Sequence, residues 1–388
     1  MNSTRELLAG GLLAAGALMA AAQAGAQTTA RAPGQPPRLG AGLDIGAVLD
    51  GSLASDELAL GTRPKGFGLG HNELTIGASI DPLFAGRLTA VAHSHDSDVE
   101  WEIEEAYMET TSLPAGLQVR GGRFLSALGY LNEQHMHADD FIERPLLYRA
   151  FLGSHYFDDG LRLQWVAPTR LYWRVTAEAM SGQTLLEESE NKPVAGAYTL
   201  GTKVGGDLGI SHSWQLGLSY LRNRLDPALD GHDHDHDHGA HEHAHGARFT
   251  GRNMFIADAV WKWAPNGNNR ERQLRLSGEY ARVTDLNEYA SSSDIHEAWY
   301  LSAVYRFAPQ WEAGLRFDEL KVREPHGDHF HAGRLREASV ALTWKPSHFS
   351  LLRLQWTDQR DRGGFDDAGQ AVFLQYVMSL GAHGAHAF

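Results

Sequence analysis

Cysteine is absent from the 388 residues of this chain, which excludes disulfide bonds and thiolate metal sites, so a metal would have to bind histidine or carboxylate. Basic residues are also scarce: 34 Lys and Arg stand against 48 Asp and Glu, and this acidic balance argues against nucleic acid as a partner. Long apolar runs are missing after residue 26, where none approaches the roughly 18 residues of a membrane-spanning helix. The mature chain is therefore expected to have no helical membrane span.

One apolar run does occur at the start of the chain. Arg5 lies in a short polar opening, residues 7–22 are rich in Leu and Ala, and Ala24-Gly25-Ala26 fits a small-residue cleavage site. We therefore predict a signal peptide over 1–26 and a short periplasmic segment over 27–39. The alternative, a membrane-spanning helix, is disfavoured because the run is short and no cluster of charges follows it.

Beyond residue 40, apolar and polar residues alternate in runs of about ten residues. Near residue 315, for example, Trp311, Leu315 and Phe317 alternate with Glu312 and Arg316. A period of two with one apolar face is the signature of a β-strand. The pattern predicts sixteen strands, near 40–49, 67–79, 84–93, 100–110, 116–126, 160–167, 170–180, 196–206, 213–223, 250–263, 271–283, 295–307, 310–322, 334–344, 349–358 and 371–382.

Two runs are irregular, 100–110 and 116–126. Four acids crowd the first: Glu102, Glu104, Glu105 and Glu109. Arg120 and Arg123 fall on opposite faces of the second, and we predict a β-bulge there. Every second connection between strands is short and carries turn residues, such as Ala308-Pro309. The other connections are mostly long, near 50–66, 94–99, 127–159, 181–195, 224–249, 284–294, 323–333 and 359–370.

This alternation of short and long connections is typical of outer-membrane barrels, which have short periplasmic turns, long external loops and an even number of strands. We therefore predict an all-β fold, a single transmembrane antiparallel β-barrel of about sixteen strands over 40–388. The expected location is the outer membrane of a Gram-negative cell, with outer-membrane lipids and the barrel assembly machinery as partners. A large secreted β-domain is the alternative.

Histidines gather in the predicted external loops, interleaved with acids. Neutral imidazole and carboxylate are ligands of Zn²⁺ and its neighbours, although Cu²⁺ and Ni²⁺ bind imidazole clusters at least as well. We predict a metal-binding surface; an incidental low-complexity loop and a pH sensor are the alternatives. The predicted external ligands are His232, His234, His236, His238, His241, His243 and His245 in loop 224–249, and His326, His329 and His331 in loop 323–333. His93, at the end of the predicted strand 84–93, and His95, in loop 94–99, are expected on the same external side.

The loop at 127–159 is longer than a bare connection and rich in aromatic residues, so we expect it to fold into the lumen as a constriction. The alternative is that its histidines only hydrogen-bond the loop backbone. The predicted ligand set at the constriction consists of Glu133, His135, His137 and Asp139, with Asp140 and His155 beside them. The residues predicted to line the pore are Arg162, Arg174, Arg275, Arg306, Arg316, Arg353, Glu178, Glu279 and Glu312, a mixed set rather than an arginine ladder for anions.

The stretch RGGRFLSALGYLNEQHMHADDFIERPLLYRAFLG and the ending SLGAHGAHAF resemble a His-rich branch of the porin-type barrels related to the phosphate-selective porins. Members of that branch are often labelled zinc-regulated TonB-dependent receptors. The resemblance implies passage of zinc or a zinc complex across the outer membrane. A TonB-dependent receptor has a large N-terminal plug domain, whereas only about 13 residues separate Ala26 from the first predicted strand, so we expect no plug here.

Together these features predict a porin-like channel that takes up zinc or another divalent transition metal, collected by loop 224–249 and relayed by His135 and His137. A general or anion-preferring porin is one alternative, and a non-conducting surface protein that binds metal is another. No organic cofactor is expected, and a homotrimer is expected by analogy with porins. An outer-membrane lipase or protease is the enzyme alternative. An enzyme is not expected, because the pattern places no nucleophile–base–acid set with Ser154-His155 or Ser211-His212 on neighbouring inward faces.

Overall fold

The computed structural model describes residues 42–381 except 96–97, 187–188, 190–192, 227–245 and 366, and the described residues belong to one compact unit. The predicted signal peptide and periplasmic segment lie outside the described residues. So do the seven histidines His232, His234, His236, His238, His241, His243 and His245.

The described residues form seventeen strands and little helix. The strands are β1 Leu43–Ala54, β2 Gly66–Leu69, β3 Asn72–Ser79, β4 Phe84–His95, β5 Asp98–Thr110, β6 Leu117–Leu125, β7 Phe157–Val166, β8 Tyr172–Met180, β9 Ala197–Leu208, β10 His212–Asn223, β11 Asn253–Trp263, β12 Gln273–Thr284, β13 His296–Ala308, β14 Trp311–His326, β15 His329–Ser347, β16 Ser350–Asp361 and β17 Gln370–Gly381. The helical elements are α2 Leu146–Phe151 and the 3-10 turns η1 Pro114–Gly116, η2 Met136–Ala138 and η3 Pro265–Gly267.

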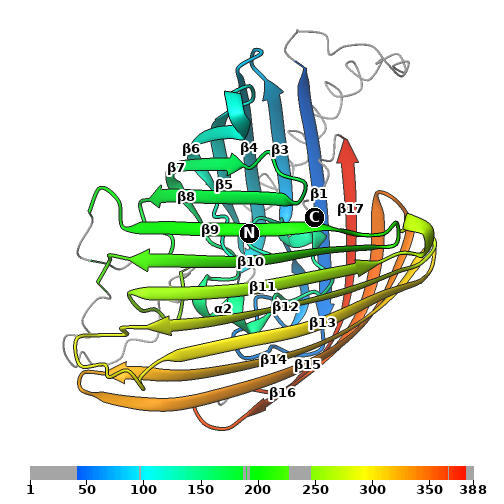
Figure 1. The fold of residues 1–388 in the computed structure, drawn as a ribbon. Helices are drawn as coiled ribbons and strands as arrows, with labels where there is room; N and C mark the ends of the chain where they lie inside the picture. The colour runs from blue at the N-terminus through cyan, green and yellow to red at the C-terminus, as the bar shows by residue number, and fades with distance from the viewer. Residues whose placement is uncertain are drawn as a thin grey trace, which may run out of the picture. The chain divides into compact units, whose positions relative to one another are not determined.

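Sixteen of the described strands close into an antiparallel ring in chain order, because β1 pairs with β17 on one side and with β3 on the other (Figure 1). The short strand β2 is the seventeenth strand and is not one of the sixteen in the ring. It pairs with the last four residues of β1, next to the part of β1 that pairs with β3. A closed ring leaves no unpaired strand edge, which is what a lipid environment demands of a β-structure. The predicted sixteen-stranded antiparallel barrel is confirmed, and each predicted strand coincides with one ring strand.

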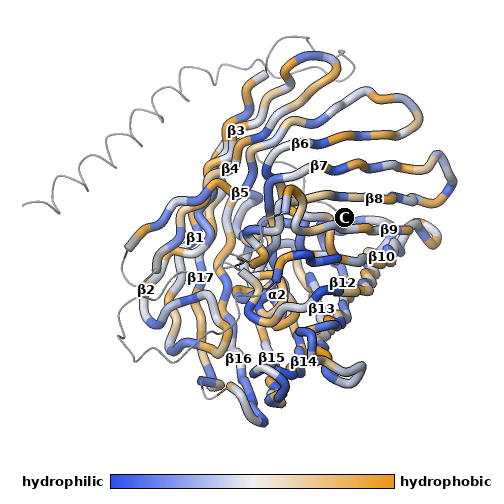
Figure 2. The backbone as a smooth tube through the Cα atoms, turned by 90° about the vertical axis from the view of Figure 1, so that its left-hand side faces the viewer, coloured by the Kyte–Doolittle hydropathy of each residue, from blue (hydrophilic) through white to orange (hydrophobic). Residues whose placement is uncertain are grey.

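The outer face of the ring is apolar, as the period-two pattern requires. Hydrophobic and hydrophilic stretches alternate along the strands (Figure 2), and the outward side chains of Leu301, Phe317 and Leu354 are exposed. Trp311 and Trp344 lie at the short-turn ends of their strands, where an interfacial aromatic girdle belongs. None of the helices within the described residues is long and apolar enough to cross a membrane. The apolar outer face of the closed ring therefore faces the lipid of the outer membrane.

Two connections predicted as long loops are tight hairpins instead. Strands β14 and β15 extend to His326 and His329, which pair across the turn, and β4 and β5 extend to His95 and Asp98. The residues of the predicted loops 323–333 and 94–99 are therefore largely strand. Both stretches are rich in histidine and acid and poor in apolar residues, so the alternation that marks a strand could not be read there.

The predicted bulge at 116–126 is wrong, because β6 pairs with β7 in one unbroken register from Leu117 to Leu125. Arg123 faces outward, where its guanidinium lies 2.8 Å from the Asp159 carboxylate, so an outward arginine needs no irregularity. The register shift lies instead between β4 and β5, opposite Thr89 and Ala90.

The segment from 126 to 156, between β6 and β7, lies inside the ring with α2 at its centre (Figure 1). Every side chain of α2 is buried. They pack in one apolar cluster with wall residues near the long-connection ends of the strands, among them Met180, Leu221, Val283, Leu320 and Leu335. This apolar cluster fills the lumen at its long-connection end. We call residues 126–156 the inner segment.

Candidate metal site in the lumen

The inner segment is bound to the wall by polar contacts on several sides. Arg316 donates to the Glu143 carbonyl at 2.6 Å, and Arg353 donates to the Asp139 carbonyl at 2.6 Å. On another strand, the Glu279 carboxylate accepts a hydrogen bond from the backbone N–H of Tyr130. These contacts fix the inner segment in place, so its side chains meet the wall in a defined geometry.

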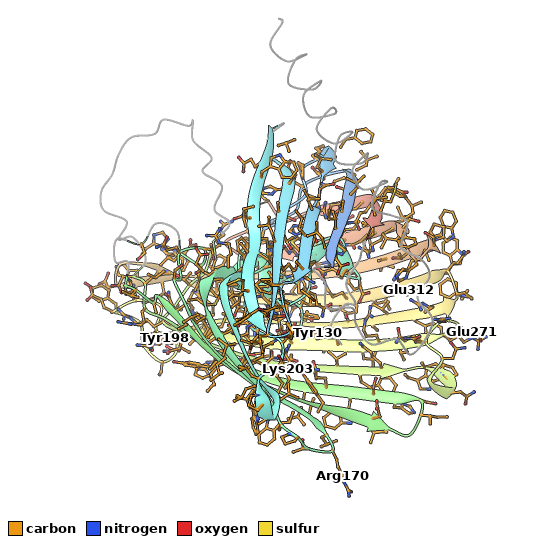
Figure 3. The ribbon with its side chains drawn as sticks, turned by 90° about the horizontal axis from the view of Figure 1, so that it is seen from above. Tyr130, Arg170, Tyr198, Lys203, Glu271 and Glu312 are labelled. Atoms are coloured by element: carbon orange, nitrogen blue, oxygen red, sulfur yellow. The ribbon has the colours of Figure 1, made fainter. Side chains whose placement is uncertain are left out.

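The residues predicted to line the pore do point inward, but most are occupied in ion pairs and hydrogen bonds. The mixed charges therefore largely cancel, and no arginine ladder runs through the lumen. In the view from above, Lys203 and Tyr130 lie in the interior, whereas Arg170 lies at an outer turn (Figure 3). The ion pairs of the predicted pore-lining residues are Arg162 with Glu178, Arg174 with Glu133, Arg275 with Asp140, Arg306 with Glu312, and Arg316 with Asp318 and Glu337.

Two predicted metal ligands of the inner segment contact cations of the protein instead. Lys203 and Arg174 bind the Glu133 carboxylate, the former at 3.0 Å. Burial opposes ionisation of Glu133, but these cations outweigh it and hold its pKa below the usual range. Asp139 pairs with the guanidinium of Arg144 at 2.8 Å. Both carboxylates are therefore neutralised by basic side chains, and neither belongs to the group of histidines described next.

Four side chains converge on one point at the junction of the inner segment and the wall: His71, Glu73, Glu104 and His135. One ligand atom from each lies within 4.8 Å of all the others. His71 Nε2 lies 3.3 Å from Glu104 Oε1, and His135 Nδ1 lies 3.1 Å from Glu104 Oε2. Two imidazoles and two carboxylates make up a four-ligand set that suits Zn²⁺ and related divalent ions. We call these four residues the lumen cluster.

His71 owes its position to a break in the strand that pairs with β1. The chain bulges between Leu69 and Glu73, and the Asp50 carboxylate accepts the backbone N–H of His71 at 3.2 Å. Gly70 permits this close approach, because a Cβ there would lie 1.6 Å from Arg63 and 2.2 Å from Asp50. The bulge therefore turns the imidazole of His71 into the lumen beside Glu73.

Glu104 is the extra residue of the β4–β5 register shift. Thr89 of β4 pairs with Glu105 of β5, and Ala90 pairs with Ile103, so Glu104 is paired with no residue of β4 in the backbone register. A bulge of this kind places two successive side chains on one face. Glu104 and Glu105 are accordingly both buried on the lumen side, at 1% and 4% exposure.

Three more side chains surround the lumen cluster: His155 lies 2.6 Å from Glu104, His137 lies 2.6 Å from Glu73, and His135 Nε2 lies 3.3 Å from Glu105. The histidines of the inner segment thus contact carboxylates of the wall. His71 Nε2 and His155 Nε2 both face Glu104 Oε1, whereas His155 Nδ1 is buried without a hydrogen bond among the described side chains. Such an atom is costly in a folded protein, and a bound cation would supply the missing partner.

Two histidines of the inner segment differ in the charge that their surroundings favour. Burial disfavours the charged form of His135, but the carboxylates of Glu73 and Glu104 outweigh it and hold its pKa well above the usual value. Burial lowers the pKa of His155 to about 4, because Glu104 offsets the loss of water only in part. The acidic surroundings thus favour the protonated form of His135, whose proton a metal ion would have to displace, whereas His155 offers a neutral imidazole.

A cavity of about 570 Å³ adjoins the lumen cluster. Glu73, His135 and His137 line it at the cluster, and Gly77 and Gln118 line it near the short-turn ends of their strands. The cavity therefore leads from the cluster toward the short-turn end of the barrel. At the long-connection end, the apolar cluster around α2 fills the lumen.

The predicted external histidines within the described residues lie apart from the lumen cluster. His326, His329 and His331 are exposed on the β14–β15 hairpin, where the rings of His326 and His331 are 4.8 Å apart between centroids. Nothing in the sequence pattern pointed to His71, Glu73 or Glu104 as ligands. The one signal that could have found them was the Glu104-Glu105 pair, which breaks the alternation of its strand.

A closed sixteen-stranded ring with an apolar exterior and a charged, partly filled lumen defines a porin-like outer-membrane β-barrel. No family model matches the chain. An uncharacterised protein of Aquifex aeolicus is 27% identical over 380 residues, which cover 89% of this chain and 75% of that protein.

Solved structures of outer-membrane proteins share the fold. OprB of Pseudomonas putida aligns with a TM-score of 0.57 and 13% identity over 87% of this chain and 94% of its own. The anion-selective porin of Comamonas acidovorans aligns with a TM-score of 0.56 and 10% identity over 88% of this chain and 100% of its own. The channel DcaP of Acinetobacter baumannii aligns with a TM-score of 0.54 and 12% identity over 89% and 99%. At these identities the likeness shows the fold alone.

Proposed function

We propose that this protein is an outer-membrane channel for a divalent transition-metal ion, with zinc as the first candidate. The observation that carries the proposal is the lumen cluster, His71, Glu73, Glu104 and His135, at the boundary between the filled part of the lumen and the open cavity. An ion bound there has the cavity ahead of it on the periplasmic side.

The ligand chemistry suits passage of an ion as well as its binding. The chain has no cysteine, so the site is built from imidazole and carboxylate, which release a divalent ion more readily than thiolates do. His137, His155 and Glu105 stand next to the four ligands as alternative partners. A set of neighbouring, interchangeable ligands permits the stepwise exchange that conduction demands.

The exposed histidines would act as collectors in this function. His326, His329 and His331 stand on the external hairpin, and the histidines of 232–245 belong to a connection of the same rim. The sequence resemblance to the His-rich branch of porin-type barrels supports zinc as the ion. Homotrimeric assembly is proposed by analogy, since OmpT of Vibrio cholerae, which shares the fold, has a trimer form.

The proposal is tested by metal flux into liposomes that contain the purified protein and a zinc-sensitive dye. Wild-type protein is expected to admit zinc, and the double variant His71→Ala/His135→Ala is expected to lose most of that flux. His348→Ala, in a short turn away from the cluster, serves as the control and should keep the wild-type flux. Equal flux through wild type and double variant would refute the proposal.

A non-conducting, metal-binding surface protein is the second candidate, and the apolar cluster around α2 favours it because it fills the external part of the lumen. Single-channel recording separates the two candidates. Openings that micromolar zinc reduces and a chelator restores support the channel, whereas the absence of openings supports the second candidate. A general or anion-preferring porin would instead conduct without any effect of zinc.

A further inference from the structure

Basic side chains gather on the outward face of the barrel, at the long-connection ends of β14, β15 and β16, which are neighbours in the ring (Figure 1). Leu320, Val322 and Leu335 point inward, because they belong to the apolar cluster around α2. Side chains alternate along a strand, so Lys321 and Arg334, which stand next to these leucines and this valine, point outward.

The outward charges of this part of the wall are mostly positive. Lys321 pairs in register with Arg334 of the next strand, and Arg336 pairs with Arg360 of the strand after that. At the long-connection ends of β12 to β16, six outward lysine and arginine side chains stand against three outward carboxylates. The cations, which we call the outer basic patch, are Arg282, Lys321, Arg323, Arg334, Arg336 and Arg360, and the acids are Glu297, Glu319 and Asp358.

Glu319 holds three cations of the outer basic patch close together. Arg334 and Arg336 each donate to the Glu319 carboxylate at 2.7 Å, and Lys321 Nζ lies 3.3 Å from it. A guanidinium carries five N–H donors, and the bond to Glu319 uses one donor of each arginine. The side chains of Lys321 and Arg336 stay 49% and 46% exposed. The cations are therefore fixed in place and still open to a ligand from outside the barrel.

The outer basic patch begins where the apolar, lipid-facing band ends. Val340 and Leu354 are exposed in that band. At its edge, Trp356 pairs with Val340 and Trp299 pairs with Glu319. Tryptophan is enriched at the boundary between hydrocarbon and headgroups. Cations just beyond these two tryptophans therefore lie at the level of the lipid headgroups.

The patch is a local feature of this wall. On β5, the outward side chains Val99, Trp101 and Ile103 are exposed, so an apolar face continues there almost to the hairpin. The cations of β12 to β16 are thus not a general consequence of a strand reaching the rim.

We propose that the outer basic patch binds the phosphate groups of a lipid in the leaflet at this end of the barrel. Long connections of outer-membrane barrels are external, so the lipid belongs to the outer leaflet. Arginine forks match phosphate oxygens, and a phosphate monoester carries about two negative charges, more than the single charge of a phosphodiester headgroup. The lipid that fits is therefore an acylated sugar with phosphate monoesters, of the lipid A type. The inference is independent of the proposed metal channel.

The test measures binding of bis-phosphorylated and of monophosphorylated lipid A to the full-length protein in detergent, by native mass spectrometry. The variant Glu319→Gln/Arg334→Gln/Arg336→Gln removes two cations together with the acid that they bind. A second variant, Lys321→Gln/Arg360→Gln, removes two exposed cations and leaves Glu319 with both arginines. Arg170→Gln/Arg272→Gln, which changes two exposed arginines at short turns, is the matched control.

Wild-type protein is expected to bind bis-phosphorylated lipid A more tightly than the monophosphorylated form. Each patch variant should bind the bis-phosphorylated form about thirtyfold more weakly, because each of two cations near an anionic lipid surface contributes about fivefold. The control should keep the wild-type affinity. Wild-type affinity in both patch variants would overturn the proposal, as would an equal loss in the control. Displacement of the lipid by millimolar inorganic phosphate would also overturn it, because the patch would then be a site for the free anion.

Discussion

Replacing Gly70 by alanine tests whether the strand break near His71 builds the lumen cluster. The new methyl group would lie 1.6 Å from the Arg63 guanidinium and 2.2 Å from the Asp50 carboxylate, so one of these groups must move. Arg63 and Asp50 form an ion pair of 2.6 Å whose side chains are 4% and 0% exposed. Separating a buried pair costs about 3–5 kcal/mol. We therefore expect Gly70→Ala to lower the free energy of unfolding by about that amount.

The same change should weaken zinc binding, because Asp50 also holds the backbone N–H of His71. The assays are guanidinium unfolding in detergent and zinc titration by calorimetry. Gly51→Ala serves as the control for the added methyl group, since a Cβ there meets nothing within 4 Å and Gly51 is not in the left-handed region. Wild-type stability together with wild-type zinc affinity in Gly70→Ala would refute the reasoning.

Three further outcomes are expected. His137→Ala should lower zinc affinity about 10–100-fold in calorimetry, because His137 holds the Glu73 carboxylate at 2.6 Å and outer partners of ligands have effects of this size. Arg316→Met should lower the free energy of unfolding by about 3–5 kcal/mol in guanidinium, because it leaves the buried Glu337 carboxylate without one of its partners. Leu147→Ala, at a fully buried position of α2, should cost about 2–5 kcal/mol in the same assay and raise the open-channel current in planar bilayers.

Each of these outcomes has a clear contrary result. Unchanged zinc affinity in His137→Ala would mean that Glu73 needs no orienting partner. Arg360→Met changes an exposed arginine paired with Asp358, so a loss in that variant equal to the loss in Arg316→Met would show that burial is not the cause. A Leu147→Ala protein as stable as wild type would show that the apolar cluster does not hold the inner segment.

The barrel could be predicted from the sequence because the pattern that marks each strand lies within that strand's own residues. Each lipid-facing residue must be apolar, so alternation marks the strands one by one, and turn residues separate them. The predicted strand ends were wrong at two hairpins whose residues are mostly histidine and acid, around His95 and His326. There the pattern resembles a polar loop although the strands continue to the hairpin.

The candidate site could be predicted only in part, because its residues are far apart in the sequence and are brought together by the pairing of the strands. His135 was expected to be a ligand from its place in the long inner segment, and the structure brings it to the lumen cluster. Its partners His71 and Glu104 reach the same point through two strand irregularities, which depend on the register of neighbouring strands. Glu133 and Asp139 are close to His135 in sequence, but cations of the wall and of the inner segment neutralise them.

Anomalous diffraction at the zinc absorption edge tests the central claim most directly, because it locates each bound ion separately from those held by exposed histidines. In crystals of the full-length protein grown with zinc, we expect a peak about 2.0–2.2 Å from ligand atoms of His71, Glu73, Glu104 and His135. The peak should vanish in His71→Ala/His135→Ala. Peaks confined to the surface, with none at the lumen cluster of the wild-type protein, would contradict the account.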